Sequence, residues 1–114
     1  MKNNHDRLMG LLGLARKSGR LTAGFDAVKD LVCREKDVLV LFAADLSPKT
    51  EKELRYAAGE LRNAIHLKAG KDEIARAIGS KKPVGVIAIE DKGFAEAVSK
   101  VCSDLEGELK EEGS

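Results

Sequence analysis

The sequence predicts an α/β protein, a three-layer α/β/α sandwich around a small mixed, mainly parallel four-stranded sheet. Two apolar runs, residues 38–43 and 84–89, have the length of strands and no polar alternation, as expected for strands covered on both faces. Segments with apolar residues at helical spacing lie between the strand candidates, and glycines or capping residues mark their ends. Strands that alternate with helices in this way favour a sheet with helices on both faces.

The first helix is predicted to begin at Asn3 or Asn4, either of which can cap it, and to end at Gly19. A short strand is predicted to follow at residues 21–23. The helix has one apolar face, because its apolar residues follow the i, i+3, i+4, i+7 spacing: Leu8, Leu11, Leu12 and Ala15.

Two further helices flank the apolar run of the second strand. Gly24 opens the first of them, which is predicted to run to about Lys36. Ser47 is a good N-cap for the other, and Pro48 stands at the first helical position, where its missing N–H costs nothing. This helix is predicted to end near Gly59.

The C-terminal part of the chain predicts two strands and two helices. A weak strand at 64–67 is followed by a short helix at 71–78, which Gly79 ends. After the last strand, Asp91 caps a final helix that is expected to fray into the acidic residues 104–112.

Length and charge indicate one domain, 1–103, followed by an acidic C-terminal tail, 104–114. The net charge of +1 conceals an asymmetry: it is +4 over residues 1–36, zero over 37–79 and −3 over 80–114. A basic end can attract phosphate, although solvated helix faces explain the same charges.

Several classes of protein are disfavoured by composition. No stretch approaches the roughly 20 apolar residues of a membrane span, so no membrane partner is expected. Cys33 and Cys102 form no CxxC pair and, with His5 and His66, no metal-ligand set. We expect two small buried thiols in a reducing cytoplasm, no metal and no cofactor. A monomer is expected, because no apolar stripe is left over once the core is filled.

Turns that follow the predicted strands can meet at one edge of the sheet, where open α/β sheets bind ligands. The turn at 24–27 and the turn at 44–48 are expected to lie side by side. The loop at 79–84 joins them if the last strand runs antiparallel to its neighbours, or if the loop is long enough to fold over.

An anionic polymer fits the residues expected at this edge. Two helix N-termini offer free N–H groups, and cations lie nearby or flank the first strand. Asp26 and Asp45 can accept from base amino groups or cap their own helices, and capping is favoured for Asp45. Phe25 either faces the ligand or anchors its helix to the core.

The small number of aromatic residues argues against a stacking surface for single-stranded RNA, so a shaped RNA fits better. The cations are Arg16, Lys17, Arg20, Lys29, Lys81 and Lys82.

Three stretches resemble the L7Ae ribosomal protein family, in particular its small bacterial YlxQ-type members. They read LLGLARKSGRLTAGFDAV, VLVLFAADLSPKT and IARAIGSKKPVGVIAIEDKGFAEAV, and the resemblance extends to about Val101. It implies an α/β/α sandwich and binding of kink-turn or kink-turn-like RNA, a sharply bent duplex with tandem sheared G·A pairs.

The family's RNA signature, G-x-N-E-x-x-K, corresponds here to Gly24 through Asp30. Asp26 replaces the Asn, so an acceptor remains while the amide donors are lost. Ala27 replaces the Glu and Asp30 the Lys, although Lys29 lies one residue earlier, about 100° away around a helix.

The resemblance also covers two loops. The family's A-E-D-x-x-P run corresponds to residues 43–48, with Ala44 in place of the acid, and its third RNA loop corresponds to residues 79–84. Pattern and resemblance together predict RNA contacts at these positions: Arg16, Lys17, Gly24, Phe25, Asp26, Lys29, Asp45, Leu46, Lys81, Lys82, Pro83 and Val84.

The predicted function is a non-catalytic, ribosomal-protein-like module that binds structured RNA. One alternative is a protein-interaction module that has kept the fold and lost kink-turn binding. Another is a phosphoacceptor receiver domain, suggested by Asp45 at a strand end and Lys82-Pro83 before the last strand. The receiver fold begins with a strand and an acidic pair for Mg²⁺, whereas this chain begins with a helix and has no such pair.

Overall fold

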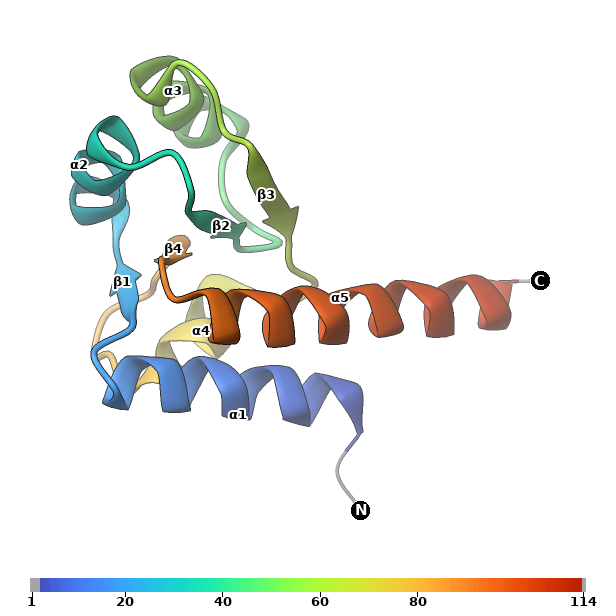
Figure 1. Ribbon diagram of the computed structural model, residues 1–114. Helices are drawn as coiled ribbons and strands as arrows, with labels where there is room; N and C mark the ends of the chain where they lie inside the picture. The colour runs from blue at the N-terminus through green and yellow to red at the C-terminus, as the bar shows by residue number, and fades with distance from the viewer. Residues whose placement is uncertain (1–2, 114) are drawn as a thin grey trace.

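The computed structural model describes residues 3–113, with side chains through residue 107, and contains five helices and four strands (Figure 1). The described part of the chain begins and ends with a helix, as the sequence predicts. In chain order the elements are α1 Asn4–Lys17, β1 Leu21–Ala23, α2 Phe25–Arg34, β2 Leu39–Phe42, α3 Pro48–Ala58, β3 Asn63–His66, α4 Lys71–Ile78, β4 Val86–Ile89 and α5 Lys92–Gly113.

The four strands form one mixed sheet in the order β1-β4-β2-β3. β4 is antiparallel to both of its neighbours, and β2 and β3 are parallel. The mixed α/β sheet is confirmed, but the expected predominance of parallel pairing is wrong. After α4 the chain folds back along that helix, so that the Val84 N–H donates to the Lys71 carbonyl at 3.2 Å. β4 therefore enters the sheet from the edge at which the other strands end.

Helices cover both faces of the sheet, which confirms the three-layer sandwich (Figure 1). α1, α4 and α5 pack on one face, and α2 and α3 on the other. Side chains of β2 and β4 alternate between two core clusters, as the pleat requires. The first cluster takes Leu39, Leu41, Ile87 and Ile89. The second takes Val40, Phe42, Val86 and Ala88.

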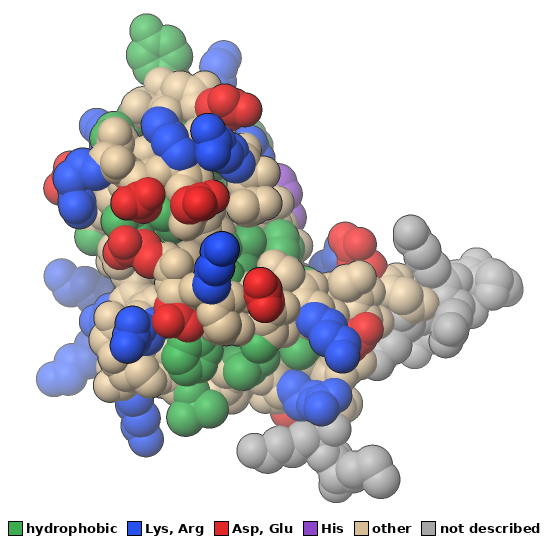
Figure 2. Space-filling model, in the orientation of Figure 1, with side chains coloured by type: hydrophobic (Ala, Val, Ile, Leu, Met, Phe, Trp, Pro, Cys, Tyr) green, Lys and Arg blue, Asp and Glu red, His purple; other side chains and the backbone are tan. Residues whose placement is uncertain are grey.

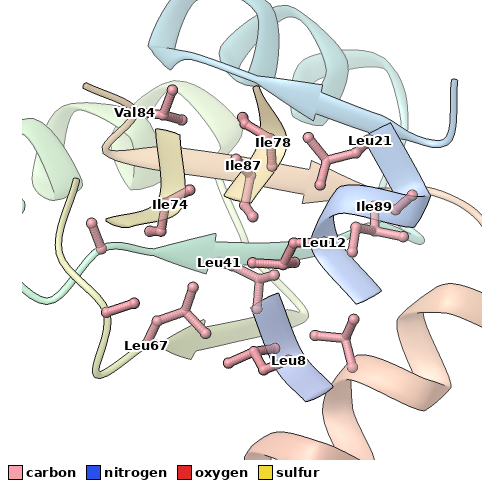
Figure 3. Packing of buried hydrophobic residues seen from close by; sticks show 14 of the residues in the cluster. Leu8, Leu12, Leu21, Leu41, Leu67, Ile74, Ile78, Val84, Ile87 and Ile89 are labelled. Atoms are coloured by element: carbon pink, nitrogen blue, oxygen red, sulfur yellow. The ribbon is translucent and has the colours of Figure 1, made fainter. Parts of the chain in front are cut away.

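Packing around Leu41 holds α1 and α4 against the sheet. Figure 3 shows Leu8 and Leu12 of α1 and Ile74 of α4 converging on Leu41 and Ile87. All five are at most 2% exposed. Complete burial of a side chain of this size contributes about 1.5–3 kcal/mol, so this contact accounts for the position of the two helices.

Three of the predicted side-chain helix caps are confirmed. Asn3 accepts from the Asp6 N–H at 2.8 Å, Ser47 from the Thr50 N–H at 3.1 Å, and Asp91 from the Phe94 N–H at 2.9 Å. Gly79 ends α4 in the left-handed conformation, with φ 74°. Each carboxylate, amide or hydroxyl oxygen satisfies an N–H that has no partner within its helix.

Several boundaries differ from the sequence prediction: the strand expected at 64–67 spans Asn63–His66, and α1 ends at Lys17, two residues before Gly19. α2 ends at Arg34, and Lys36 lies beyond it, where its Nζ donates to the carbonyls of Val32 (3.1 Å) and Ala58 (2.5 Å). Residues 84–85 precede β4 instead of forming its start. α5 continues to Gly113, where fraying was expected.

The two thiols differ in exposure. Cys33 is exposed on α2, so the prediction that it is buried is wrong: the inner face of α2 is formed by its neighbours Leu31 and Val32. Cys102 is half-buried, and burial, with a smaller effect of Glu106, raises its thiol pKa to about 11. Among the described residues, no helix is both long and apolar enough to cross a membrane.

Two glycines inside α1 have different surroundings. A Cβ on Gly13 would lie 2.9 Å from the backbone oxygen of Ala77 in α4, whereas a Cβ on Gly10 would meet nothing within 4 Å. Gly13 therefore permits the close approach of α1 and α4. Gly10 has no such role and only weakens the helix.

We expect Gly13→Ala and Gly10→Ala to have opposite effects on the free energy of unfolding. Gly13→Ala should lower it by about 1–3 kcal/mol, because the backbone of α4 must shift. Gly10→Ala should raise it by about 0.5–1 kcal/mol, because alanine restricts the unfolded chain and favours the helix. Urea unfolding of the two variants measures both values, and equal effects would contradict the close-packing role of Gly13.

Candidate nucleic-acid interface

Four segments meet at one edge of the sheet, which we call the loop edge: residues 24–27, 43–48, 67–71 and 79–85. Main-chain hydrogen bonds join them through the start of β4. The Gly24 N–H donates to the Val86 carbonyl at 3.0 Å, and the Ala43 N–H to the Gly85 carbonyl at 2.9 Å. The turns after β1 and β2 therefore flank the same strand, as expected. The third loop joins them because β4 is antiparallel.

The α2 end of the loop edge begins with a glycine that its backbone requires. Gly24 has φ 97° and ψ 152°, a conformation that residues with a Cβ rarely adopt. It has no side chain to cap α2. Within the described residues, the amides of Phe25, Asp26 and Ala27 have no protein acceptor. The first turn of α2 thus keeps its N–H groups available for an anion.

Asp45 caps a helix other than the one predicted. Its Oδ1 accepts from the Lys71 N–H at 2.8 Å, at the start of α4, whose own N-cap residue is Gly70. Ser47 already caps α3. The expectation that Asp45 caps the helix that follows it is therefore wrong, because β3 and α4 bring the uncapped Lys71 amide across the loop edge.

Leu46 and Val84 lie in the interior of the loop edge. Leu46 is half-buried and contacts both core clusters. A Cβ on Gly85 would stand 2.7 Å from Leu46 Cδ1, so the leucine packs directly on this glycine. Val84 is 6% exposed and belongs to the core beneath α1 and α4. Both side chains support the loops from below.

Lys81 and Lys82 project from the loop edge into solvent, and Pro83 beside them is exposed. Ser80 fixes the loop that carries them: its hydroxyl donates to the Lys82 carbonyl at 2.9 Å and accepts from the Lys82 N–H at 3.3 Å. Within the described residues, neither lysine side chain makes an ion pair or a hydrogen bond. Both charges are therefore free to meet a phosphate.

The remaining candidate cations lie on either side of the loop edge. Lys29 is exposed on α2 and lines a groove between α2 and α3, together with Phe25, which is half-buried against the core. Arg16 and Lys17 lie at the end of α1, before β1, whereas Gly24 follows β1. Lys17 shares a hollow with Gly79. Gly79 begins the segment at 79–85 that carries Lys81 and Lys82, which we call the lysine loop. Figure 2 shows Lys and Arg side chains along the margin where α1 ends and β1 begins.

A polar cluster beside the loop edge was not anticipated from the sequence. Glu51 of α3 contacts His66 at the end of β3 (2.7 Å) and Arg55 one turn later (2.8 Å). His66 and Arg55 in turn lie on the ring of the buried Phe42. The i, i+4 spacing of Glu51 and Arg55 could have indicated their pairing, but no local signal indicates His66.

Burial by itself would raise the pKa of Glu51, but the hydrogen bonds from His66 and Arg55 and their charges outweigh it. The carboxyl pKa is therefore held below its ordinary value of 4.5. Within the described residues, no group of three or more His, Cys, Asp or Glu side chains could hold a metal ion.

Comparison with known proteins agrees with this architecture. Residues 6–99 match the model of the ribosomal protein L7Ae/L30e/S12e/Gadd45 family. The chain is 29% identical to the RNA-binding protein YlxQ of Enterococcus faecium over 88% of this chain and 95% of that protein. It is 27% identical to the large ribosomal subunit protein eL30 of Yarrowia lipolytica, over 86% and 91% of the two chains.

Solved structures have the same fold. A Bacillus halodurans protein of unknown function superposes with a TM-score of 0.75 at 26% identity, over 85% of this chain and 97% of that one. The Giardia lamblia 15.5kD RNA binding protein superposes with a TM-score of 0.69 at 20% identity, over 94% and 91% of the chains.

Removal of the Asp45 carboxylate should destabilise the start of α4. We expect Asp45→Ala to lower the free energy of unfolding by about 0.5–2 kcal/mol, the usual effect of losing a helix cap. Asp45→Asn, which keeps the acceptor oxygen, should cost less. Hydrogen exchange of the Lys71 amide locates the effect, and an unchanged exchange rate in Asp45→Ala would rule out the cap.

The stabilisation provided by Glu51 should depend on pH. Since its folded-state pKa is depressed, its contribution is complete above the ordinary value of 4.5 and is lost as pH falls through the folded-state pKa. The partners are partly exposed, so the contribution should stay below about 1 kcal/mol.

Urea unfolding from about pH 6 to about pH 3 compares the protein with Glu51→Gln. The difference between their free energies of unfolding should become smaller as the pH falls. Glu53→Gln, at an exposed neighbour, is the matched control for the change of charge. A Glu51→Gln difference that grew toward acid would contradict the assignment.

Proposed function

Because the chain belongs to the ribosomal protein L7Ae/L30e/S12e/Gadd45 family, we propose that it binds structured RNA at the loop edge, without a catalytic step. The ligand we propose is a kink-turn or a related bent duplex. The observation that supports this most strongly is that the uncapped start of α2 is bonded to Val86 of β4, while the exposed Lys81 and Lys82 stand on the loop that leads into the same strand.

Fixed N–H groups and nearby cations suit a phosphate backbone held in one shape. The start of α2 is anchored to the sheet, because the Gly24 N–H donates to the Val86 carbonyl of β4. The lysine loop is held by Ser80. Contacts of this kind position an RNA by the spacing of its phosphates, without reading its bases. A preformed set of donors therefore favours an RNA whose backbone already has the matching bend.

Departures from the family signature reduce the capacity to read bases. Asp26 is exposed in the first turn of α2 and offers only acceptor oxygens. Ala27 is exposed and has no polar group. Each lost bidentate base contact typically costs about 1–3 kcal/mol of discrimination. We therefore infer that this chain depends more on phosphate contacts than a relative with the full signature.

The relatives support RNA as the ligand. YlxQ is named an RNA-binding protein and eL30 a large ribosomal subunit protein, so ribosomal RNA is one source of the proposed ligand. The receiver-domain alternative does not fit the fold, since that class has parallel strands in the order 2-1-3-4-5, whereas β4 here is central and antiparallel. A protein partner in place of RNA stays a competing outcome of the binding experiment.

We expect Lys81→Ala and Lys82→Ala each to weaken RNA binding and to reduce the slope of log affinity against log salt by about 1, because each removes a phosphate contact. The measurement is calorimetric titration with a standard kink-turn RNA at several salt concentrations. Lys100→Ala, on the exposed side of α5, is the matched control and should leave the slope unchanged.

The same RNA with its G·A pairs broken tests the kink-turn part of the proposal. Tighter binding to the intact RNA supports a preference for the bend. Equal and steeply salt-dependent binding to both RNAs limits the function to phosphate attraction. Absence of binding to both would overturn the proposal and favour a protein partner.

A further inference from the structure

A groove of about 500 Å³ runs between α2 and α3 and extends away from the loop edge. Three lysines line it, Lys29 from α2 and Lys49 and Lys52 from α3, with Glu53 as the carboxylate among them. Within the described residues, no ion pair or side-chain hydrogen bond engages the three ammonium groups. The lining thus carries a net charge of +2.

Aromatic side chains stand at both ends of the groove. Phe25 is the first residue of α2 and is half-buried, whereas Tyr56, near the end of α3, is 90% exposed. The other large exposed apolar side chain among the described residues, Leu14, is 56% exposed. An aromatic ring that is exposed to solvent beside unpaired lysines contributes little to the stability of the fold. Its position is better explained by contact with a ligand.

The groove opens at the loop edge. α2 and α3 both begin there and pack on the same face of the sheet, and contacts at their far ends keep them side by side: Cys33 Sγ lies 3.4 Å from the Ala57 carbonyl oxygen. Lys49 is the second residue of α3, and Tyr56 follows seven residues later, about 10 Å along the axis. A chain leaving an RNA at the loop edge can therefore enter the groove directly.

We infer that this groove binds a short single-stranded RNA segment that adjoins the structured RNA. Lys49 and Lys52, about one turn apart on α3, and Lys29 across the groove neutralise phosphates, and Tyr56 offers a stacking face for a base. Glu53 accepts from an exocyclic amino group, such as that of cytosine. This inference rests on the proposed function for the identity of the ligand as RNA. It departs from the sequence-based expectation of no stacking surface, because the fold brings two of the four aromatics to one groove.

The exposed Tyr56 ring favours RNA over an acidic peptide, because charge alone suits both. Peptide carboxylates would satisfy the lysines but would leave the Tyr56 ring without a planar partner. A nucleotide supplies both an anion and a π face in each repeat. Figure 2 shows Lys and Arg side chains interspersed with Asp and Glu over α2 and α3, so charge alone does not make this face a general anion binder.

The test uses three fluorescent RNAs with the full chain: a standard kink-turn, the same kink-turn with a six-nucleotide cytidine extension, and the extension alone. We expect the extension to tighten binding. Tyr56→Ala should abolish that gain, a loss of about fivefold to a hundredfold, while Tyr56→Phe keeps it. Lys52→Ala should reduce the salt slope for the extended RNA by about 0.7 and leave the slope for the bare RNA unchanged.

Leu14→Ala is the matched control for Tyr56→Ala, and neither change should alter binding of the bare kink-turn. If the bare kink-turn does not bind but the extension alone does, in a Tyr56-dependent manner, the proposed function fails and the groove inference stands. If the extension has no effect on affinity and does not bind by itself, the groove inference is overturned, whatever the bare kink-turn does. Binding of poly-glutamate in place of the extension would likewise overturn it.

Discussion

The insertion of β4 between β1 and β2, antiparallel to both, is the constraint on which the rest of the structure depends. It makes the start of β4 coincide with the ends of the other strands, so three helix starts and the loop at 79–85 share one edge. A parallel β4 would have placed that loop, with its two lysines, at the other end of the sheet. The site therefore follows from strand direction before any side chain is considered.

Polar groups at the loop edge divide into those that the fold uses and those that it leaves free. Asp45 and Ser47 each satisfy a helix amide, and Leu46 fills the space above Gly85. The Asp45 carboxylate thus accepts a hydrogen bond from the Lys71 N–H, which lessens its repulsion of an anion. Free donors and charges remain at the start of α2 and in the lysine loop, on either side of this fixed middle.

The positions of Asp30 and Lys29 on α2 connect the altered signature with the basic groove. Asp30 stands where the family has a lysine, and Lys29 directs its charge toward the space between α2 and α3. There it joins two lysines of α3. A displacement of one residue on a helix changes direction by about 100°, so Lys29 lines the groove, whereas Asp30 stands at the position of the signature lysine. In the binding mode that we propose, the RNA is held through its phosphates and through stacking more than through its base edges.

Local patterns in the sequence determined most helices and strands, three of their caps and the α/β class, because apolar periodicity and capping chemistry act over a few residues. Strand direction, the reach of Asp45 to Lys71, the exposure of Cys33 and the meeting of His66 with Glu51 were decided only by the tertiary structure. Each of these four features depends on how segments that are distant in the sequence pack against one another. The chain encodes such contacts through the whole core, so no single stretch of residues carries their signal.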